Sequence, residues 1–197
     1  AFEIAATYAG RDDRPARNAQ LPVLLPSHIF RIALGQEVAR AHRHEHGLSV
    51  LLFDVDTPAA VDDDRADDQL TGRVGALARR FFRTHDWIAR HGDCSIAALL
   101  PETPLDHAAE LGMNFCDMVG QRLVLADFQT GAETRATISA AVAGADSVEA
   151  DCDAEFILTA LESAVIRARL DGGNRLERIA LDEVWRSGKG GAVNCEI

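Results

Sequence analysis

The sequence lacks several features that would point to common classes of protein. No apolar run in its 197 residues approaches the roughly 20 residues that a membrane-spanning helix needs, and no signal peptide is recognisable. An excess of basic residues is also missing. The formal net charge of -11 argues against binding to nucleic-acid polymers, whose phosphates attract a basic face. We therefore expect no membrane segment in this chain and no nucleic-acid polymer among its partners.

Cysteines are few, and their spacing shows no pairing. The chain has 4 of them, at positions 94, 116, 152 and 195, with no CxxC motif. This spacing is typical of free or buried thiols in a reducing compartment rather than of a disulfide framework. We therefore expect a cytoplasmic protein. Because the sequence begins with Ala1, it could also be the cytoplasmic part of a larger or membrane-tethered protein.

Helical and strand patterns follow one another over residues 27–181. Residues 1–26 are rich in Arg, Asp, Pro and Ala, and we interpret them as a linker or the edge of a preceding domain, and 182–197 as a C-terminal tail. The predicted helices begin at Ser27, cover 70–81, begin after an N-cap at Thr103 with Pro104 as the first helical residue, and cover 153–170. The predicted strands are 49–53, 87–90, 96–100, 136–142 and 176–181.

The order of these elements predicts the fold class. Its central part is β-α-β-β-α-β, the split βαβ or ferredoxin-like plan, preceded by one helix and followed by a helix and a strand. We predict an α+β domain of ferredoxin-like plan with a five-stranded, mainly antiparallel sheet and surrounding helices. The run Ser49–Phe53 is apolar on both faces and would be a central strand beside the hairpin. The crossover helices would cover one face.

Two carboxylates, Asp54 and Asp56, end the predicted central strand and would face the tight turn at Gly92-Asp93. In nucleotidyl-transfer palms, carboxylates so placed hold divalent metals that clamp a triphosphate for in-line attack. Two aspartates that simply end a strand would look the same, and this local pattern alone favours that plainer interpretation.

Five motifs in one order carry a more specific signal. They are LLFDVD (51–56), RTHD (83–86), ARHGDCSIAALLPET (89–103), TISAAVA (137–143) and SAVIRARLDGGNR (163–175). In type, order and spacing they resemble the motifs of the GGDEF family, the diguanylate cyclase domain, from about Ser27 to Arg175. The resemblance implies the palm fold and a guanine nucleotide as ligand.

The signature turn departs from the family. Here it is Gly92-Asp93-Cys94-Ser95-Ile96, and Cys94 takes the position whose carboxylate would ligate metal and activate the attacking hydroxyl. Ser95 takes the next acidic position, and Asp93 would compensate only if the turn slipped by one residue. A neutral thiol is a poor magnesium ligand. We therefore expect a catalytically inactive domain with no catalytic residues, no metal site beyond a vestigial Asp54, and neither magnesium nor another cofactor.

Three further positions bear on GTP. Asp62 falls where the family's guanine-reading Asn would be, and it lacks the amide donor for guanine O6. Gly173 replaces a basic residue that contacts phosphate, while Arg169 keeps the charge of the family's Lys. These departures predict weak or no GTP binding.

One functional motif of the family is retained. In many of these cyclases, RxxD just before the signature turn is the inhibitory site for the product, cyclic di-GMP, and here it is Arg83-Thr84-His85-Asp86. Arg83 offers paired donors to guanine O6 and N7 or to phosphate, and Asp86 can accept from guanine N1–H and its amine. The plainer alternative is an exposed Arg83–Asp86 ion pair that contributes little.

Other arginines add to this expectation. Arg79, Arg80 and Arg90 would supply local positive charge, and Arg40 of the first helix would be a second arginine in the ligand set. The resulting hypothesis is an inactive GGDEF-like domain that serves as a cyclic di-GMP receptor, as a homodimer or with a partner protein or neighbouring domain. The alternatives are a non-binding dimerisation scaffold, and a residual diguanylate cyclase or GTP-binding domain.

Overall fold

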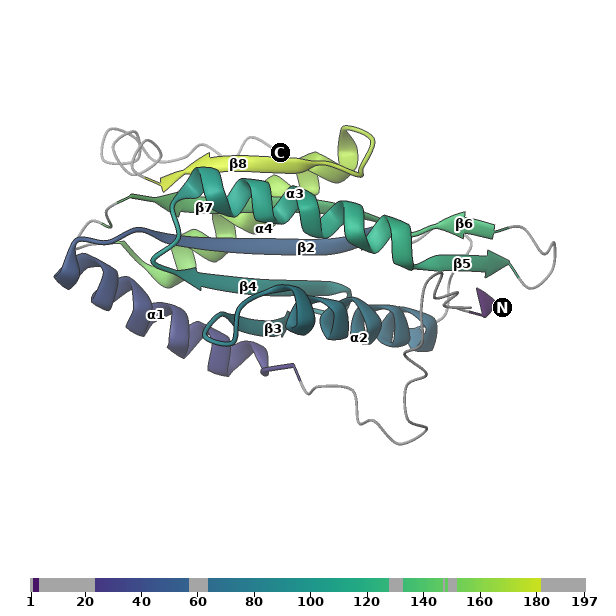
Figure 1. Cartoon of the computed structure of the whole chain (residues 1–197), viewed down its shortest axis with the longest axis horizontal. Helices are drawn as coiled ribbons and strands as arrows, with labels where there is room; N and C mark the ends of the chain where they lie inside the picture. Colours follow the sequence, from purple (N-terminus) through teal and green to yellow (C-terminus); the bar gives the residue numbers. More distant parts are fainter. Residues whose placement is uncertain are drawn as a thin grey trace.

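The computed structural model of the chain describes residues 2–3, 24–56, 64–127, 133–146, 148 and 152–181. In them, a five-stranded sheet with the order β3-β4-β2-β7-β8 lies between helices on both faces (Figure 1). Its strands are β2 (Leu48–Asp56), β3 (Trp87–His91), β4 (Ser95–Pro101), β7 (Thr137–Ala145) and β8 (Leu176–Ala180). The helices are α1 (Ser27–His44), α2 (Asp64–Phe81), α3 (Leu105–Arg122) and α4 (Ala154–Leu170).

Strand β2 is the centre of the sheet, as its apolar sequence predicts. It pairs antiparallel with β4 and with β7, and only the edge strand β8 runs parallel to its neighbour β7. The predicted mainly antiparallel sheet is therefore confirmed. The strand is longer than predicted, because pairing with β7 continues through Asp56. Asp54 thus lies inside the strand, paired with Ser95 on one side and Ser139 on the other.

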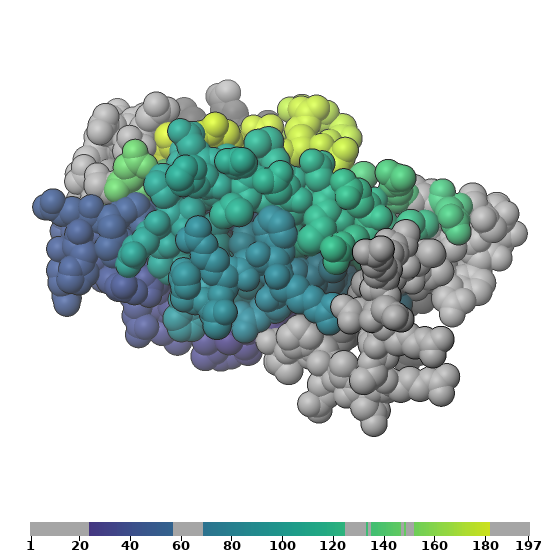
Figure 2. All heavy atoms as spheres, viewed as in Figure 1, coloured from purple at the N-terminus to yellow at the C-terminus, as the bar shows by residue number. Residues whose placement is uncertain are grey.

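Two hydrophobic layers bury the sheet. Leu51, Phe53 and Val55 of β2 pack under α2 and α3, while Val50 and Leu52 pack under α1 and α4. The side chains of α2 and α3 cover the face shown in Figure 2. The crossover helices α2 and α3 therefore cover one face, as predicted, and the two outer helices cover the other. No helix within the described ranges is both long enough and apolar enough to span a membrane.

The chain contains a second, small sheet that the sequence patterns did not indicate. It has the order β1-β5-β6 and consists of Phe2–Glu3, Val124–Asp127 and Glu133–Arg135. Leu25 also joins the main sheet: its N–H donates to Ile88 O at 3.1 Å, and its carbonyl accepts from Arg90 N at 3.0 Å. Packing onto the domain thus begins before Ser27. Most of the predicted linker 1–26, and the predicted tail 182–197, lie outside the described residues.

The start of α3 differs from the prediction. Pro104, with φ -62° and ψ 154°, is the residue before the first helical residue Leu105, and Thr103 does not cap the helix. The Thr103 hydroxyl donates instead to Pro101 O at 3.0 Å. The physical reason is the preceding Glu102, whose φ of 53° turns the chain sharply after β4 and directs the Thr103 side chain back toward the strand end.

Candidate functional site

A groove of about 890 Å³ lies between α1, the end of α2 and the turn between β4 and α3. It brings together Arg40, Arg83 and Asp86, the three residues that the sequence singled out for a ligand. The other lining residues are Leu25, Glu37, Arg79, Thr84, His85, Trp87, Pro101 and Glu102. The structure therefore groups the predicted residues on one surface, although they come from segments more than 40 positions apart in the chain.

A cluster of aromatic rings fixes the end of α2 that carries two of the groove's arginines. Phe81, its last residue, and the following Phe82 lie with ring centroids 5.1 Å apart in an edge-to-face arrangement. Both contact Phe115 of α3 at 5.4 Å, and Phe115 contacts Phe53 of β2 at 4.8 Å. Such pairs contribute about 0.5–1.5 kcal/mol each beyond their buried area. The helix end is therefore held firmly against the core, and the groove has a rigid wall.

Asp86 is buried at the base of this wall. Its side chain is only 3% exposed, and Oδ2 accepts a hydrogen bond from the Arg83 backbone N–H at 2.7 Å. In return, the Asp86 N–H donates to Arg83 O at 3.1 Å, which closes a tight turn. The predicted alternative, an exposed Arg83–Asp86 ion pair, is therefore wrong. Burial raises the pKa of Asp86, and the hydrogen bond from Arg83 N only partly opposes this rise.

The second oxygen of Asp86 is the unusual atom of the groove. Oδ1 is buried and has no hydrogen-bond partner among the described residues. The exposed His85 lies nearby, with its Nε2 3.9 Å from Oδ1, beyond hydrogen-bond distance. A buried carboxylate oxygen without a donor costs about 1–3 kcal/mol or more. Such an atom needs a donor from outside the described residues, which a ligand or an ordered water would supply.

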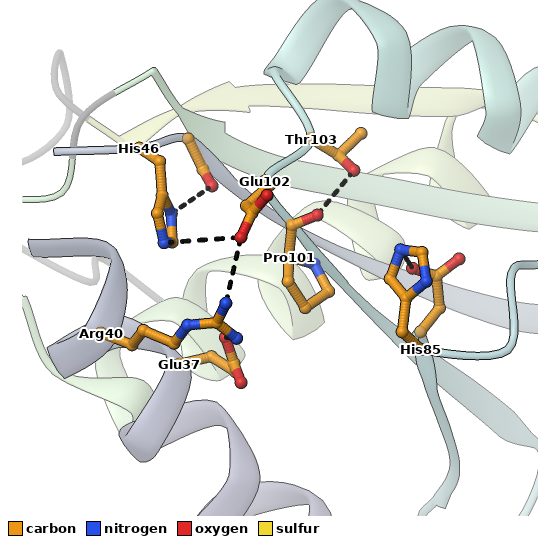
Figure 3. Close-up of polar contacts among 9 residues, drawn as sticks. Glu37, Arg40, His46, His85, Pro101, Glu102 and Thr103 are labelled. Carbon is orange, nitrogen blue, oxygen red and sulfur yellow. Dashed lines mark hydrogen bonds and ion pairs between the residues drawn. The ribbon is translucent and has the colours of Figure 1, made fainter. Parts of the chain in front are cut away.

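The arginines of the groove differ in whether their guanidinium groups already bind a carboxylate. The guanidinium groups of Arg79 and Arg83 have no hydrogen bond or ion pair to any residue that the structure describes. Arg40, in contrast, donates hydrogen bonds to Glu102 Oε1 at 3.1 Å and to Glu37 Oε2 at 3.5 Å (Figure 3). Sequence reasoning missed both glutamates, because Glu37 lies in none of the motifs and Glu102 has no assigned role within the motif 89–103. An acidic residue next to a predicted ligand arginine becomes visible only once the fold is known.

Two of the arginines expected to add charge lie elsewhere. Arg90 donates through Nε to Gly92 O at 3.2 Å and through Nη2 to Asp93 O, so it supports the signature turn rather than the groove. Arg90 therefore does not line the groove. Arg80 is exposed and does not line the groove, whereas its neighbour Arg79 does.

The signature turn keeps the register that the sequence predicts. Gly92, with φ 65°, begins the turn, and Ser95 pairs with both His91 and Asp54. The Val55 N–H donates to Cys94 O at 3.4 Å, which confirms that the turn lies beside the carboxylates of β2. Asp93 is exposed at the tip. The turn has not slipped, and Asp93 does not replace the carboxylate missing at position 94.

The carboxylates of β2 are occupied by donors of the protein itself. Arg169 of α4 donates to Asp54 Oδ2 at 2.7 Å, and Ser95 donates to Asp54 Oδ1 at 3.3 Å. Asp56 accepts from Ser139 Oγ at 2.7 Å, Thr137 Oγ1 at 2.9 Å and Asn174 N at 3.2 Å. Burial raises the pKa of Asp54, and the positive charge of Arg169 opposes this rise. Arg169, which keeps the charge of the family's Lys, is therefore paired with Asp54.

Other residues that the sequence singled out have structural roles, where the structure describes them. Gly173 has φ 70°, and a Cβ atom there would lie 3.3 Å from Asp56 Oδ2, so this backbone closes over the carboxylate. Cys94, Cys116 and Cys152 are free thiols, as predicted. Burial raises the pKa of Cys116 to about 12 and that of Cys152 to about 11, so both stay protonated and unreactive. Asp62 and Cys195 lie outside the described residues.

Comparisons with known proteins agree with this geometry. The family model described as "Diguanylate cyclase, GGDEF domain" matches residues 24–175. The diguanylate cyclase DgcP of Pseudomonas aeruginosa is 30% identical over 148 residues, which cover 73% of this chain and 21% of that protein. The chain therefore spans about a fifth of the length of this curated relative.

Solved structures establish the fold. The GGDEF domain of DgcB from Caulobacter crescentus, in complex with c-di-GMP, has a TM-score of 0.66 at 17% identity and covers 86% of this chain and 97% of that one. The GGDEF domain of FimX from Pseudomonas aeruginosa has a TM-score of 0.63 at 19% identity, with 84% and 99% covered. The α+β fold predicted from the order of elements is thereby confirmed.

Proposed function

Because the chain belongs to the GGDEF family of diguanylate cyclase domains, we propose that it is a catalytically inactive member that acts as a receptor for cyclic di-GMP. The ligand site is the groove that Arg83 and Asp86 line, with Arg40 as a further contact. Binding of the ligand changes how the domain interacts with a partner protein, a neighbouring domain or a second copy of the chain. The free thiols fit a reducing compartment such as the cytoplasm.

The receptor proposal rests on a hydrogen-bond acceptor and hydrogen-bond donors that line the same groove and lack partners among the residues that the structure describes. Asp86 Oδ1 is a buried acceptor without a donor, while the guanidinium groups of Arg79 and Arg83 are donors without an acceptor within the described part of the chain. Cyclic di-GMP satisfies both. Guanine N1–H and its amine donate to a carboxylate, and O6, N7 and the phosphates accept from arginine.

Size and charge support the same ligand. A volume of about 890 Å³ lies within the range of pockets that hold small molecules, and the half-buried Trp87 offers an apolar wall. The protein carries a net charge of -11, so a dianion cannot be attracted by the overall field. Affinity must come from a few directed contacts, and the groove gathers three arginines for them.

The proposal of inactivity rests on the donors that surround Asp54 and Asp56. Each of their four carboxylate oxygens accepts a hydrogen bond from the protein, and Arg169 already neutralises charge at Asp54. Magnesium needs oxygen ligands in a near-octahedral set, and the turn offers Cys94 and Ser95 where carboxylates would complete it. The residues present therefore do not fit the two-metal chemistry of a nucleotidyl cyclase, and we derive no step through a metal.

Titration of matched arginine variants with cyclic di-GMP tests the receptor proposal. Arg83→Ala should weaken binding about tenfold to a hundredfold, because a bidentate guanine or phosphate contact is worth about 1–3 kcal/mol. Arg80→Ala is the control: it removes the same charge from the same helix end but outside the groove. Equal losses in both variants would show that binding depends on general charge, and the groove assignment would be wrong.

A chromatographic assay of GTP and magnesium with the purified protein tests inactivity. We expect no cyclic di-GMP to form. Cys94→Glu alone should not restore turnover, because Arg169 still occupies Asp54 and Ser95 is still neutral. Product formation by the wild-type protein that Asp54→Ala abolishes would establish a residual cyclase instead.

A further inference from the structure

Glu102 lies beside the ligand groove in an unusual backbone conformation. It lies in the turn between β4 and α3 with φ 53°, a left-handed conformation that only Gly, Asn and Asp adopt readily. Its exposed carboxylate accepts from Arg40 Nη2 at 3.1 Å. It also faces a second groove, of about 680 Å³, which we call the histidine groove. The histidine groove is lined by Arg40 and Glu102 together with His44, His46 and His107.

The carboxylate of Glu102 stands between the side chains of Arg40 and His46. Figure 3 shows it with Arg40 of α1 on one side and His46 on the other. His46 Nε2 is 4.0 Å from Glu102 Oε1, and it is buried with no hydrogen-bond partner among the described residues. Glu102 therefore lies at the border of the two grooves, beside both Arg40 and His46.

We propose that Glu102 is an electrostatic latch on Arg40 that sets how tightly the groove binds an anionic ligand. The inference rests on the proposed function of the groove and names its regulation. While Glu102 holds Arg40, one of the three groove arginines is neutralised and a carboxylate faces the incoming phosphates. An anionic ligand must displace that carboxylate before Arg40 can contact it. Glu102 acts through Arg40 and is thus a positioning residue, not a ligand contact.

Glu37 does not explain the same effect. It also approaches Arg40, but at 3.5 Å and from the same helix, three positions earlier, and its side chain is 13% exposed. Glu37 therefore moves with Arg40 and orients it. Glu102 comes from a different segment, 62 positions away, and its side chain is 58% exposed. Only Glu102 can separate from Arg40 without disturbing α1.

A double-mutant cycle with cyclic di-GMP as the probe tests the latch. Glu102→Gln keeps the side-chain shape and removes the charge, and we expect it to raise affinity about three- to tenfold at low salt, less at high salt. In an Arg40→Gln background, the same substitution should change affinity by less than about twofold, because the latch has nothing to hold. Glu110→Gln, an exposed carboxylate of α3 outside both grooves, is the control for net charge.

The outcomes separate the latch from the receptor proposal. Tighter binding in Glu102→Gln that disappears in the Arg40→Gln background supports the latch. An equal gain in affinity in both backgrounds, or in Glu110→Gln, overturns the latch but does not contradict the receptor proposal. Binding by Glu102→Gln alone, with none by wild type, supports the latch but overturns the wild-type receptor. No binding by any variant overturns both. If Glu102→Gln is unstable, Glu102→Asn replaces it, because Asn tolerates the left-handed backbone.

Discussion

Substitution of Asp86 separates its structural role from its role toward ligand. One oxygen, Oδ2, accepts the Arg83 N–H at 2.7 Å inside the protein, and the other, Oδ1, has no donor among the described residues. Asp86→Ala removes both and leaves the Arg83 N–H without its partner. We expect a loss of about 1–2 kcal/mol of stability. For a chain of this size, each kcal/mol corresponds to a fall of about 2–4 °C in Tm.

Asp86→Asn should behave differently. Its single carbonyl oxygen can still accept from Arg83 N and it carries no buried charge, so Tm should not fall below that of the wild type. The amide then presents N–H groups where Oδ1 stood, and these oppose guanine N1–H and the exocyclic amine. Binding of cyclic di-GMP should therefore weaken about tenfold to a hundredfold. Cyclic di-AMP should be affected less, because adenine carries no N1–H.

Thermal unfolding and calorimetric titration of the two variants, side by side, check this separation. The expected pattern is an Ala variant that is both less stable and weaker in binding, and an Asn variant that is weaker in binding only. An Asn variant that binds cyclic di-GMP as well as the wild type would show that Oδ1 makes no guanine contact. An Ala variant of unchanged Tm would refute the role assigned to the Oδ2 hydrogen bond.

Three further predictions concern charge. Because burial raises the pKa of Asp86 above its unfolded value of about 3.8, acidification through that raised value should stabilise the wild type relative to Asp86→Asn, and the gain should vanish as pH rises again. Cyclic di-GMP binding should weaken over the same fall in pH, since protonated Asp86 loses its charge; titrations at several pH values check this. Arg169→Ala should cost about 1–2 kcal/mol at neutral pH, and less in acid where Asp54 is protonated, as measured by denaturant unfolding.

The sequence carried much of the fold because its apolar patterns match the burial. The run that ends at Phe53 has no polar residue after Ser49, and Ser49 is itself buried, with its hydroxyl donating to Thr103 O at 2.8 Å. A strand covered on both faces needs this composition. Local capping was harder to predict. Thr103 precedes a proline and looks like an N-cap, but the positive φ at Glu102 turned its hydroxyl toward the strand.

For the candidate site, too, the sequence predicted which residues take part but not what they contact. Its residues were found from a linear motif, since Arg83 and Asp86 share one turn, and Arg40 came from the first helix. The state of these residues depends on contacts between distant segments, which no local pattern reports. Examples are the capture of Arg40 by Glu102 and the pairing of Arg169 with Asp54 across 115 positions. Charge alone suggested Arg90 as a contributor, but the turn at Gly92 holds it.

Titration of the wild-type protein with cyclic di-GMP, with GTP in parallel, tests the central claim most directly. The buried acceptor at Asp86 and the unpaired arginines predict saturable binding of cyclic di-GMP, and the occupied carboxylates of β2 predict no product from GTP. Binding that saturates below about 100 µM, a free energy of about -5.5 kcal/mol, agrees with the receptor. No detectable binding at that concentration contradicts it and favours a dimerisation scaffold.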